Sequence, residues 1–265
     1  MRSQESLSKR RWSDEDSKIN IVCSFCDNNI KKYPSFIGKK NNFCDMECRD
    51  KYVLKKYDAL YDTFENNIDE VAYLFGLMLG DGHLRKMDQK NTTRVDISFN
   101  TKEKDMIKLA KNVMSKLEIN FYSQIQKNCN CLHLGFILPD NLLKKYDMLW
   151  IGSKFHANPY PVERIMENIN FVAGLINSDG WCGHFHSRKN LKRIVFCNTV
   201  RSIVDSLESS LGKNKIDYRC YHRDGVIDKR TKKKNKEQWV VSINKKETIS
   251  KLINECSYNL KEFKV

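Results

Sequence analysis

The stretch "YLFGLMLGDGHL", from Tyr73 to Leu84, is an apolar segment that runs directly into Gly80-Asp81-Gly82. The apolar residues predict a helix that begins near Ile68 and ends near Leu79. Glycine weakens a helix end, and the free carbonyl groups at a helix C-terminus repel a carboxylate. The position of Asp81 is therefore unfavourable unless another group compensates for its charge.

A second stretch, "NFVAGLINSDGWCG" from Asn170 to Gly183, repeats this pattern 98 positions later, counted from Asp81 to Asp179. Asn100, in "FNT", follows Asp81 by 19 positions, and Asn198, in "CNT", follows Asp179 by the same 19. Two motifs and one matching spacing predict an internal duplication.

Both copies predict the same order of elements, helix, strand, strand, helix, strand, strand, helix. After a polar break near 63–67, the first copy predicts helices at 68–79, 104–117 and 141–148 and strands at 84–88, 94–99, 121–126 and 131–137. The second predicts helices at 163–178, 201–211 and 247–256 and strands at 183–188, 193–197, 216–223 and 238–243. We therefore expect an α+β fold of two αββαββα repeats.

The motif stretches "LFGLMLGDG" (Leu74 to Gly82) and "VAGLINSDG" (Val172 to Gly180) resemble those of single-chain, two-motif LAGLIDADG homing endonucleases. The resemblance runs from about residue 68 to the C-terminus. It implies two motif helices side by side at the centre and two four-stranded antiparallel sheets that form a saddle over double-stranded DNA. The expected division is a first repeat at 67–150, a linker at 151–163 and a second repeat at 164–265.

The resemblance implies that Asp81 and Asp179 lie together at the ends of the two helices and bind Mg²⁺. Backbone carbonyl groups near Gly80 and Ser178 are further candidate ligands, since Mg²⁺ prefers hard oxygen donors. Metal ions of this kind promote phosphodiester hydrolysis. Small residues recur four positions apart in each motif, and Gly76 and Gly174 are expected to let the helix backbones approach closely.

Two lysines are candidate catalytic cations. Lys154, in "WIGSKFHANPYP", stands shortly before a proline and upstream of the second motif, as in many members of the family. Its counterpart in the second half is expected after the last helix, where Lys261 or Lys264 fits. Asn100-Thr101 and Asn198-Thr199 fall where the family places polar residues that position water, although a helix N-cap would use the same residue types.

The sequence departs from the family pattern at Leu79 and Asn177, which occupy a consensus position that is often Asp. That position is not the metal ligand. The acidic residue before each final glycine is present in both motifs, which argues against a relative that has lost catalysis.

DNA-contacting residues are predicted from strand alternation. Val95, Ile97 and Phe99 are expected to face the core, so their neighbours face outward. A β-ribbon can read base edges in the major groove. The candidate DNA contacts are Arg94, Ser98, Tyr122, Gln124, Gln126, His184, Arg188, Arg219 and Arg223, together with Lys232, Lys233 and Lys234 in the basic loop "KRTKKKNK".

Cys23, Cys26, Cys44 and Cys48 follow the spacing C-x2-C-x17-C-x3-C, with the second pair at the start of a helix expected at 45–56. Four thiolates so spaced suit a closed tetrahedral Zn²⁺ site, and the surrounding polar segment is too short to hold a core unaided. We expect a flexible basic arm at 1–20 and a zinc-binding module at 21–60. Lysines between the two cysteine pairs offer a contact to DNA phosphates, and a purely structural role is the alternative.

The composition indicates which kind of partner the protein binds and where in the cell it works. Of 265 residues, 47 are Lys or Arg and 33 are Asp or Glu, a net charge of +14 that favours nucleic acid as partner. No apolar run approaches a membrane span, and the N-terminus lacks a signal core, so an intracellular, non-secreted protein is expected. Ten cysteines in such a chain indicate thiols or metal ligands.

The predicted function is a Mg²⁺-dependent endonuclease that makes double-strand cuts at a long asymmetric DNA site, as a pseudo-symmetric monomer. Two alternatives remain open: an intron maturase that binds structured RNA, and a non-catalytic DNA-binding regulator on the same scaffold. An intein-embedded nuclease needs splicing residues at both ends, and Met1 and the terminal "KEFKV" do not supply them.

Overall fold

The computed structural model describes residues 17–38, 41–87, 91–126, 129–150, 152–185, 188–225 and 236–261, with the side chains of 185 and 188–190 left out. The chain divides into two compact units, Met1–Leu60 and Tyr61–Val265.

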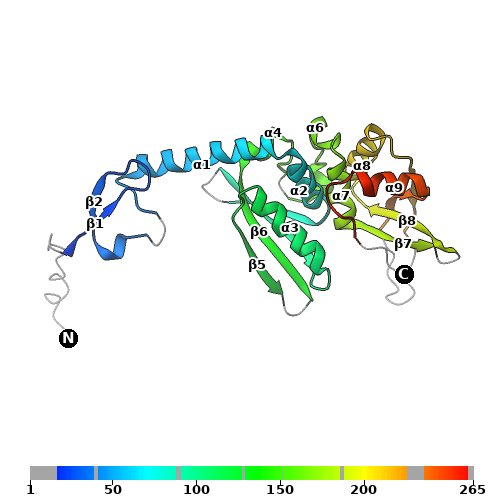
Figure 1. The fold of residues 1–265 in the computed structure, drawn as a ribbon, viewed down its shortest axis with the longest axis horizontal. Coiled ribbons are helices and arrows are strands. Elements are labelled where there is room, and N and C mark those ends of the chain that lie inside the picture. The colour runs from blue at the N-terminus through cyan, green and yellow to red at the C-terminus, as the bar shows by residue number, and fades with distance from the viewer. Residues whose placement is uncertain are drawn as a thin grey trace. The chain divides into compact units, whose positions relative to one another are not determined.

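The larger unit contains the duplication (Figure 1). Its first half comprises α2 (Ile68–Asp81), β3 (Gly82–Lys86), β4 (Thr92–Asn100), α3 (Lys104–Lys116), β5 (Phe121–Gln126), β6 (Cys131–Pro139) and α4 (Asp140–Lys145). Its second half comprises α7 (Ile169–Asp179), β7 (Gly180–Phe185), β8 (Arg188–Asn198), α8 (Arg201–Lys213), β9 (Arg219–Arg223), β10 (Gln238–Ile243) and α9 (Lys246–Glu255). The prediction of an α+β fold with two αββαββα repeats is confirmed.

Each half folds its strands into a four-stranded antiparallel sheet with the same neighbour order. That order is β3-β4-β6-β5 in the first half and β7-β8-β10-β9 in the second. Alternation divides the faces of each sheet, since successive side chains in a strand point to opposite sides. In β4, Val95, Ile97 and Phe99 are buried, as predicted, while the residues between them are partly exposed. One face of each sheet therefore packs on helices, and the other carries polar side chains.

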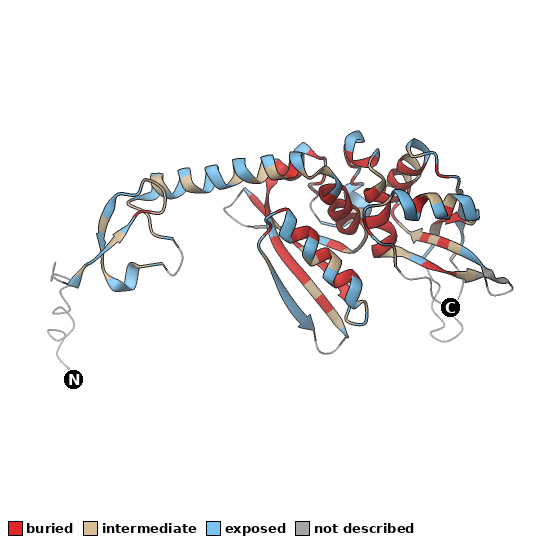
Figure 2. Ribbon diagram, viewed as in Figure 1, coloured by how far each residue is buried: buried red, intermediate tan, exposed pale blue. Residues whose placement is uncertain are grey.

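The centre of the unit is the pair α2 and α7, which Figure 2 shows as the most deeply buried helices. In α2 every residue from Glu70 to Leu79 is buried, and in α7 every residue from Asn170 to Ser178. A helix that is apolar on all sides is stable only inside a core. These two helices thus form the structural axis on which the two halves meet.

Several predicted helix and strand boundaries differ from those in the structure. The first helix, expected at 45–56, continues as α1 (Met46–Asn66), because no glycine or proline interrupts it, and the expected break near 63–67 reduces to Asn67. The helix expected at 163–178 is two helices, α6 (Glu163–Met166) and α7, since the Asn168 side chain caps α7 by accepting the Asn170 N–H. The expected linker contains the short helix α5 (Lys154–Ala157).

The smaller unit has little regular structure. It comprises the hairpin β1 (Ile19–Val22) and β2 (Asn29–Lys32), the 3-10 turn η3 (Pro34–Phe36) and the beginning of α1. Among the described residues of this unit, Cys23 is the one apolar residue that is fully buried. Among the described residues of the whole chain, no helix combines the length and the apolar character needed to cross a bilayer.

Candidate active site and nucleic-acid interface

The crossing of α2 and α7 depends on glycine. A Cβ atom on Gly76 would lie 2.4 Å from the Phe171 carbonyl oxygen and 2.9 Å from the Cα of Gly174. A Cβ on Gly174 would lie 2.2 Å from the Tyr73 carbonyl oxygen. Distances this short exclude any side chain, so the two backbones touch directly. One turn further on, Gly80 faces Ser178 in the same way, since a Cβ on Gly80 would lie 1.8 Å from Ser178 Oγ.

Both helices end at their acidic residue. Asp81 is the last residue of α2 and Asp179 the last of α7, and the following glycine in each case begins the first strand. Gly82 N–H bonds the Met78 carbonyl, and Gly180 N–H bonds the Ile176 carbonyl. Because the helices still touch one residue before these ends, at Gly80 and Ser178, the two carboxylates lie near enough for the charge of Asp179 to act on Asp81.

The two predicted catalytic lysines lie on the helix ends. Lys154 Nζ donates to the carbonyl oxygen of Leu79 at 2.8 Å and also bonds the Gly80 carbonyl. Lys261 Nζ donates to the Ser178 carbonyl oxygen at 2.7 Å. Each ammonium therefore bonds the carbonyl group just before an acidic residue, where the helix dipole is negative. The candidate carbonyl ligands Gly80 and Ser178 already accept these hydrogen bonds.

The protonation behaviour of these groups follows from burial. Burial and, next, the charge of Asp179 raise the pKa of Asp81 to about 6, although the charges of Lys261 and Lys154 oppose this change. Burial also raises the pKa of Asp179. Burial lowers the pKa of Lys154 to about 8, although both carboxylates oppose this change. Two partly desolvated carboxylates at one point form a site that a divalent cation would stabilise.

Asn177 is a residue of this site whose role the sequence does not reveal. Its Oδ1 accepts the Lys261 N–H at 2.8 Å, and its Nδ2 donates to the Asn259 carbonyl at 2.9 Å and to the Tyr73 hydroxyl at 3.1 Å. The side chain thereby fixes the segment that carries Lys261 against the motif helices. The departure from the consensus at this position was the available signal, but its partner is distant in sequence.

The outward face of the first sheet holds the predicted DNA contacts of the first half. A cavity of about 460 Å³ opens on it, lined by His83, Arg94, Asp96, Ser98, Gln124, Gln126 and His133. Ser98 Oγ lies 2.9 Å from His133 Nδ1, and His133 Nε2 lies 3.1 Å from Gln126 Oε1. Ser98, His133 and Gln126 are therefore held in a connected row before any partner binds.

Tyr122 and Arg94 form a second cluster on the same face. The Tyr122 hydroxyl donates to Asp96 at 2.5 Å, Arg94 Nε lies 2.9 Å from the same carboxylate, and the guanidinium lies 4.9 Å from the Tyr122 ring centre. The tyrosine ring covers Gly135, where a Cβ would lie 2.0 Å from it. His83, Asp96 and His133 were not among the predicted contacts. Strand alternation already turns Asp96 outward, but cross-strand register, which sequence alone does not fix, places His83 and His133 beside it.

The second sheet places its predicted residues unequally. Arg219 and Arg223 are exposed on β9 and face outward with Tyr221, since they lie opposite alternate residues of β10. His184 does not share this face. It follows Cys182 by two positions, and Cys182 is 2% exposed on the side that packs against helices. The side chain of Arg188 and the residues Lys232, Lys233 and Lys234 lie outside the described part of the chain.

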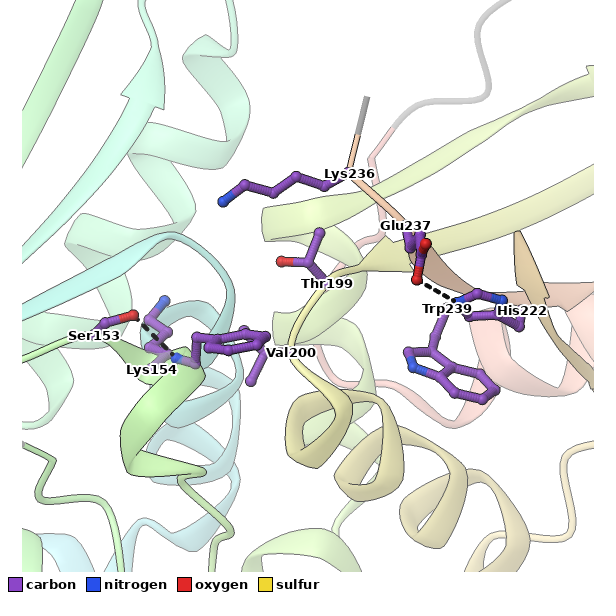
Figure 3. Close-up of a pocket in the computed structure, with 9 residues that line it drawn as sticks. Ser153, Lys154, Thr199, Val200, His222, Lys236, Glu237 and Trp239 are labelled. Atoms are coloured by element: carbon purple, nitrogen blue, oxygen red, sulfur yellow. Dashed lines mark hydrogen bonds and ion pairs between the residues drawn. The ribbon is translucent and has the colours of Figure 1, made fainter. Parts of the chain in front are cut away.

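A cavity of about 730 Å³ lies beside Lys154, between α5 and the ends of β9 and β10 (Figure 3). Figure 3 shows Lys236 extending across the opening, with His222 and Trp239 on the far wall. Arg201 lies 4.2 Å from the Trp239 ring centre, and the His222 ring lies 4.9 Å from it. The cavity thus joins the candidate catalytic lysine to a cationic and aromatic surface.

The four cysteines of the smaller unit come together. Their Sγ atoms all lie within 4.8 Å of one another, with 3.4 Å between Cys26 and Cys44 and 3.8 Å between Cys48 and Cys26. Sulfur atoms bound to one tetrahedral Zn²⁺ stand about 3.8 Å apart, as follows from a Zn–S bond of about 2.3 Å. The residues fit a zinc ion.

Local hydrogen bonds support this cysteine cluster. Burial opposes the ionisation of Cys23, but the N–H groups of Cys26, Phe25 and Cys44 outweigh it and lower the pKa of the thiol to about 6. The thiolate is the form that binds metal. Asp45 accepts the Cys48 N–H at 2.7 Å and so begins the helix that carries the fourth cysteine.

Comparison with known proteins gives a likeness of fold. No protein-family model matches the chain, and no curated protein matches it. It is similar to I-DmoI in a crystal structure with DNA and Ca, at 20% identity and a TM-score of 0.45, over 75% of this chain and 95% of that one.

The chain is also similar to the homing endonuclease I-WcaI bound to its DNA recognition sequence, at 16% identity and a TM-score of 0.45, over 74% of this chain and 87% of that one. For full-length DUF199/WhiA from Thermatoga maritima, the identity is 11% and the TM-score 0.46, over 72% of this chain and 56% of that one. Identities this low do not establish which reaction, if any, the chain carries out.

Proposed function

We propose that this chain is a site-specific double-stranded DNA endonuclease of the LAGLIDADG homing type. The observation that carries the proposal is the pairing of Asp81 and Asp179 at the ends of two helices that cross backbone to backbone through Gly76 and Gly174. Such a crossing delivers one carboxylate from each half to one place. A fold that needed only stability would gain nothing from burying two like charges there.

The acidic pair would hold Mg²⁺. Its carboxylates are hard oxygen donors, and burial raises both pKa values, so a dication would replace the missing solvation. When bound, such ions activate a water molecule and stabilise the leaving oxygen in phosphodiester hydrolysis. In this site Lys154 and Lys261 supply positive charge next to each carboxylate, positioned to attract and orient an anionic phosphate.

The two sheets would bind the duplex. The outward face of the first sheet presents Arg94, Ser98, Tyr122, Gln124 and Gln126, with Ser98 and Gln126 joined through His133, and Arg94 and Tyr122 joined through Asp96. The second sheet presents Arg219 and Arg223. Side chains of these types read base edges or bind phosphates. The net charge of +14 supplies the long-range attraction. Because the two faces differ in sequence, the target is asymmetric and one chain suffices to bind it.

The smaller unit would bind one structural Zn²⁺ through Cys23, Cys26, Cys44 and Cys48. Within that unit the described residues offer almost no apolar core, so the metal would supply the folding free energy.

The test uses a supercoiled plasmid that carries the genomic sequences flanking this chain's coding segment, joined without that segment. The wild-type chain is expected to linearise it with Mg²⁺ and not with EDTA. Asp81→Asn and Asp179→Asn should each abolish the double-strand cut, whereas Asp62→Asn, at an exposed position of α1, should not. Tight binding without cutting would overturn the nuclease proposal and favour a DNA-binding regulator. Preferential binding of the corresponding RNA would favour a maturase.

A further inference from the structure

The two acidic residues have different surroundings. Asn198 Nδ2 donates to Asp179 Oδ2 at 2.8 Å. Asn100, which stands at the same sequence spacing from Asp81, bonds the Lys102 N–H through its Oδ1 at 3.0 Å. Among the described residues, no side-chain amide donates to Asp81. One carboxylate is therefore held by a neutral donor, and the other is not.

The difference arises from strand register. Gly82 lies opposite Ile97, whereas Gly180 lies opposite Phe196, so the connection is one residue longer in the second half. A shift of one residue moves a side chain to the other face of a sheet. Asn198 consequently shares the helix side with Phe196, where Asp179 ends its helix, while Asn100 falls on the outward face with Ser98.

The orientation of the Asn198 amide is fixed by a second hydrogen bond. Its Oδ1 accepts the Val200 N–H at 2.8 Å, which leaves the NH₂ group as the end that reaches Asp179. If the amide were reversed, its Oδ1 would face the Asp179 carboxylate oxygen, and two acceptors would be in contact. The bond engages Oδ2, and among the described residues no hydrogen bond engages Oδ1, the oxygen that could take another ligand.

The first half is different in charge as well. Lys261 Nζ lies 3.6 Å from Glu103 Oε1, and the negative charge of Glu103 contributes to raising the pKa of Asp81. The corresponding N-cap of α8 is Val200, which carries no charge. Asp81 is thus surrounded by charged groups, while Asp179 has an additional neutral hydrogen-bond donor.

We propose that Asn198 is a positioning residue for Asp179, and that the two strand cuts of this protein are therefore chemically inequivalent. The inference rests on the proposed nuclease function. Losing the amide should slow the cut that depends on Asp179 and leave the other cut much less affected, so that nicked DNA accumulates.

The experiment compares strand-specific cutting of a duplex labelled differently on each strand, cut from the plasmid described above. Asn198→Ser keeps a side-chain oxygen for the Val200 N–H but cannot reach Asp179. We expect the ratio of the two strand-cutting rates to change about 10-fold from its wild-type value, because a hydrogen bond to a charged group is lost. The strand whose cutting slows should be the one more impaired by Asp179→Asn.

Asn100→Ser is the matched control, since it alters the same kind of turn in the other half and the Asn100 side chain bonds the Lys102 N–H and neither Asp81 nor Asp179; it should change both strand rates by the same factor. Asn198→Asp is a second variant, for use if the serine variant folds poorly. It keeps the turn but replaces the donor to Asp179 by an acceptor, so it should increase the difference between the two strand-cutting rates. An unchanged strand ratio in both Asn198 variants would overturn the inference alone. A wild-type chain that never cuts would overturn the proposed function, and the inference with it.

Discussion

Gly76 and Gly174 face each other across the α2–α7 crossing so closely that a Cβ on either would lie 2.9 Å from the Cα of the other. The neighbouring atoms are backbone atoms, which cannot move aside as a flexible side chain would. The helices therefore tolerate no methyl group at this point.

Gly76→Ala should lower the free energy of unfolding by about 3 kcal/mol, the cost of overpacking a rigid contact. Urea denaturation measures it. Gly212→Ala is the control: Gly212 lies in α8 with no atom within 4 Å of an added Cβ, so alanine there should stabilise by about 0.5–1 kcal/mol through helix propensity. Equal effects of the two substitutions would contradict the close crossing.

Asp81→Asn should stabilise the metal-free protein at neutral pH. The folded pKa of Asp81 is raised from 3.8 to about 6, so the folded state binds the proton more tightly and its ionisation costs the fold about 3 kcal/mol. The gain should be complete above about pH 6 and shrink as pH falls towards 3.8. Melting temperatures in EDTA across this range check it, with Asp62→Asn as the exposed control; a variant less stable than wild type at neutral pH would contradict this expectation.

Removal of zinc should unfold the smaller unit and spare the larger one. Chelation, or Cys44→Ser, should release about one Zn²⁺ per chain and speed amide exchange in residues 17–38 and 41–50. Exchange in α2 and α7 should not change. Cys129→Ser, at an exposed cysteine outside the cluster, serves as the control. Unaltered exchange around Cys23 after complete zinc loss would argue against a metal-dependent fold.

Asn177→Leu should loosen the segment that carries Lys261. It removes hydrogen bonds to Lys261 N–H, the Asn259 carbonyl and the Tyr73 hydroxyl, so a loss of about 2–3 kcal/mol is expected. Amide exchange at Lys261 should rise and cutting should slow. Tyr73→Phe removes only the hydroxyl contact and should cost about 1 kcal/mol without exposing the Lys261 amide. Protection of that amide in the leucine variant would show that other contacts hold it.

His133→Ala should relax base discrimination on the first sheet, because His133 joins Ser98 to Gln126. A panel of targets with single base-pair changes should lose about 10-fold discrimination at one or two positions and keep it elsewhere. Ile125→Ala, on β5 but on the opposite face, should leave the profile intact. A uniform loss of affinity at all positions would mark His133 as a support for phosphate contacts instead.

Much of the fold follows from local patterns. The apolar motifs, the alternation in β4 and the cysteine spacing each depend on near neighbours along the chain, and each appears in the structure as expected. Helix boundaries are harder to predict, because the last turn of α1 packs on distant residues: Phe64 contacts the rings of Phe75 and Tyr146.

The details of the site were accessible only in part. The equal spacing from Asp81 to Asn100 and from Asp179 to Asn198 suggests equivalent residues, yet a one-residue difference in register places them on opposite faces of their sheets. Asn177 reaches Asn259 and Lys261, and no local pattern indicates a contact over that separation. Register and long-range contacts are set by the folded chain as a whole.

The glycine crossing also bears on how such proteins can be recombined. A contact made from backbone to backbone carries little side-chain identity, so the α2 half could in principle be joined to a foreign α7 half that presents small residues at the same positions. The buried hydrogen bond between Tyr73 and Asn177 differs, since it is a side-chain match across the seam, as is the exposed bond between Asp69 and Asn168. A chimera that keeps this pair together would retain the native junction, and one that separates it would leave a buried hydroxyl without a partner.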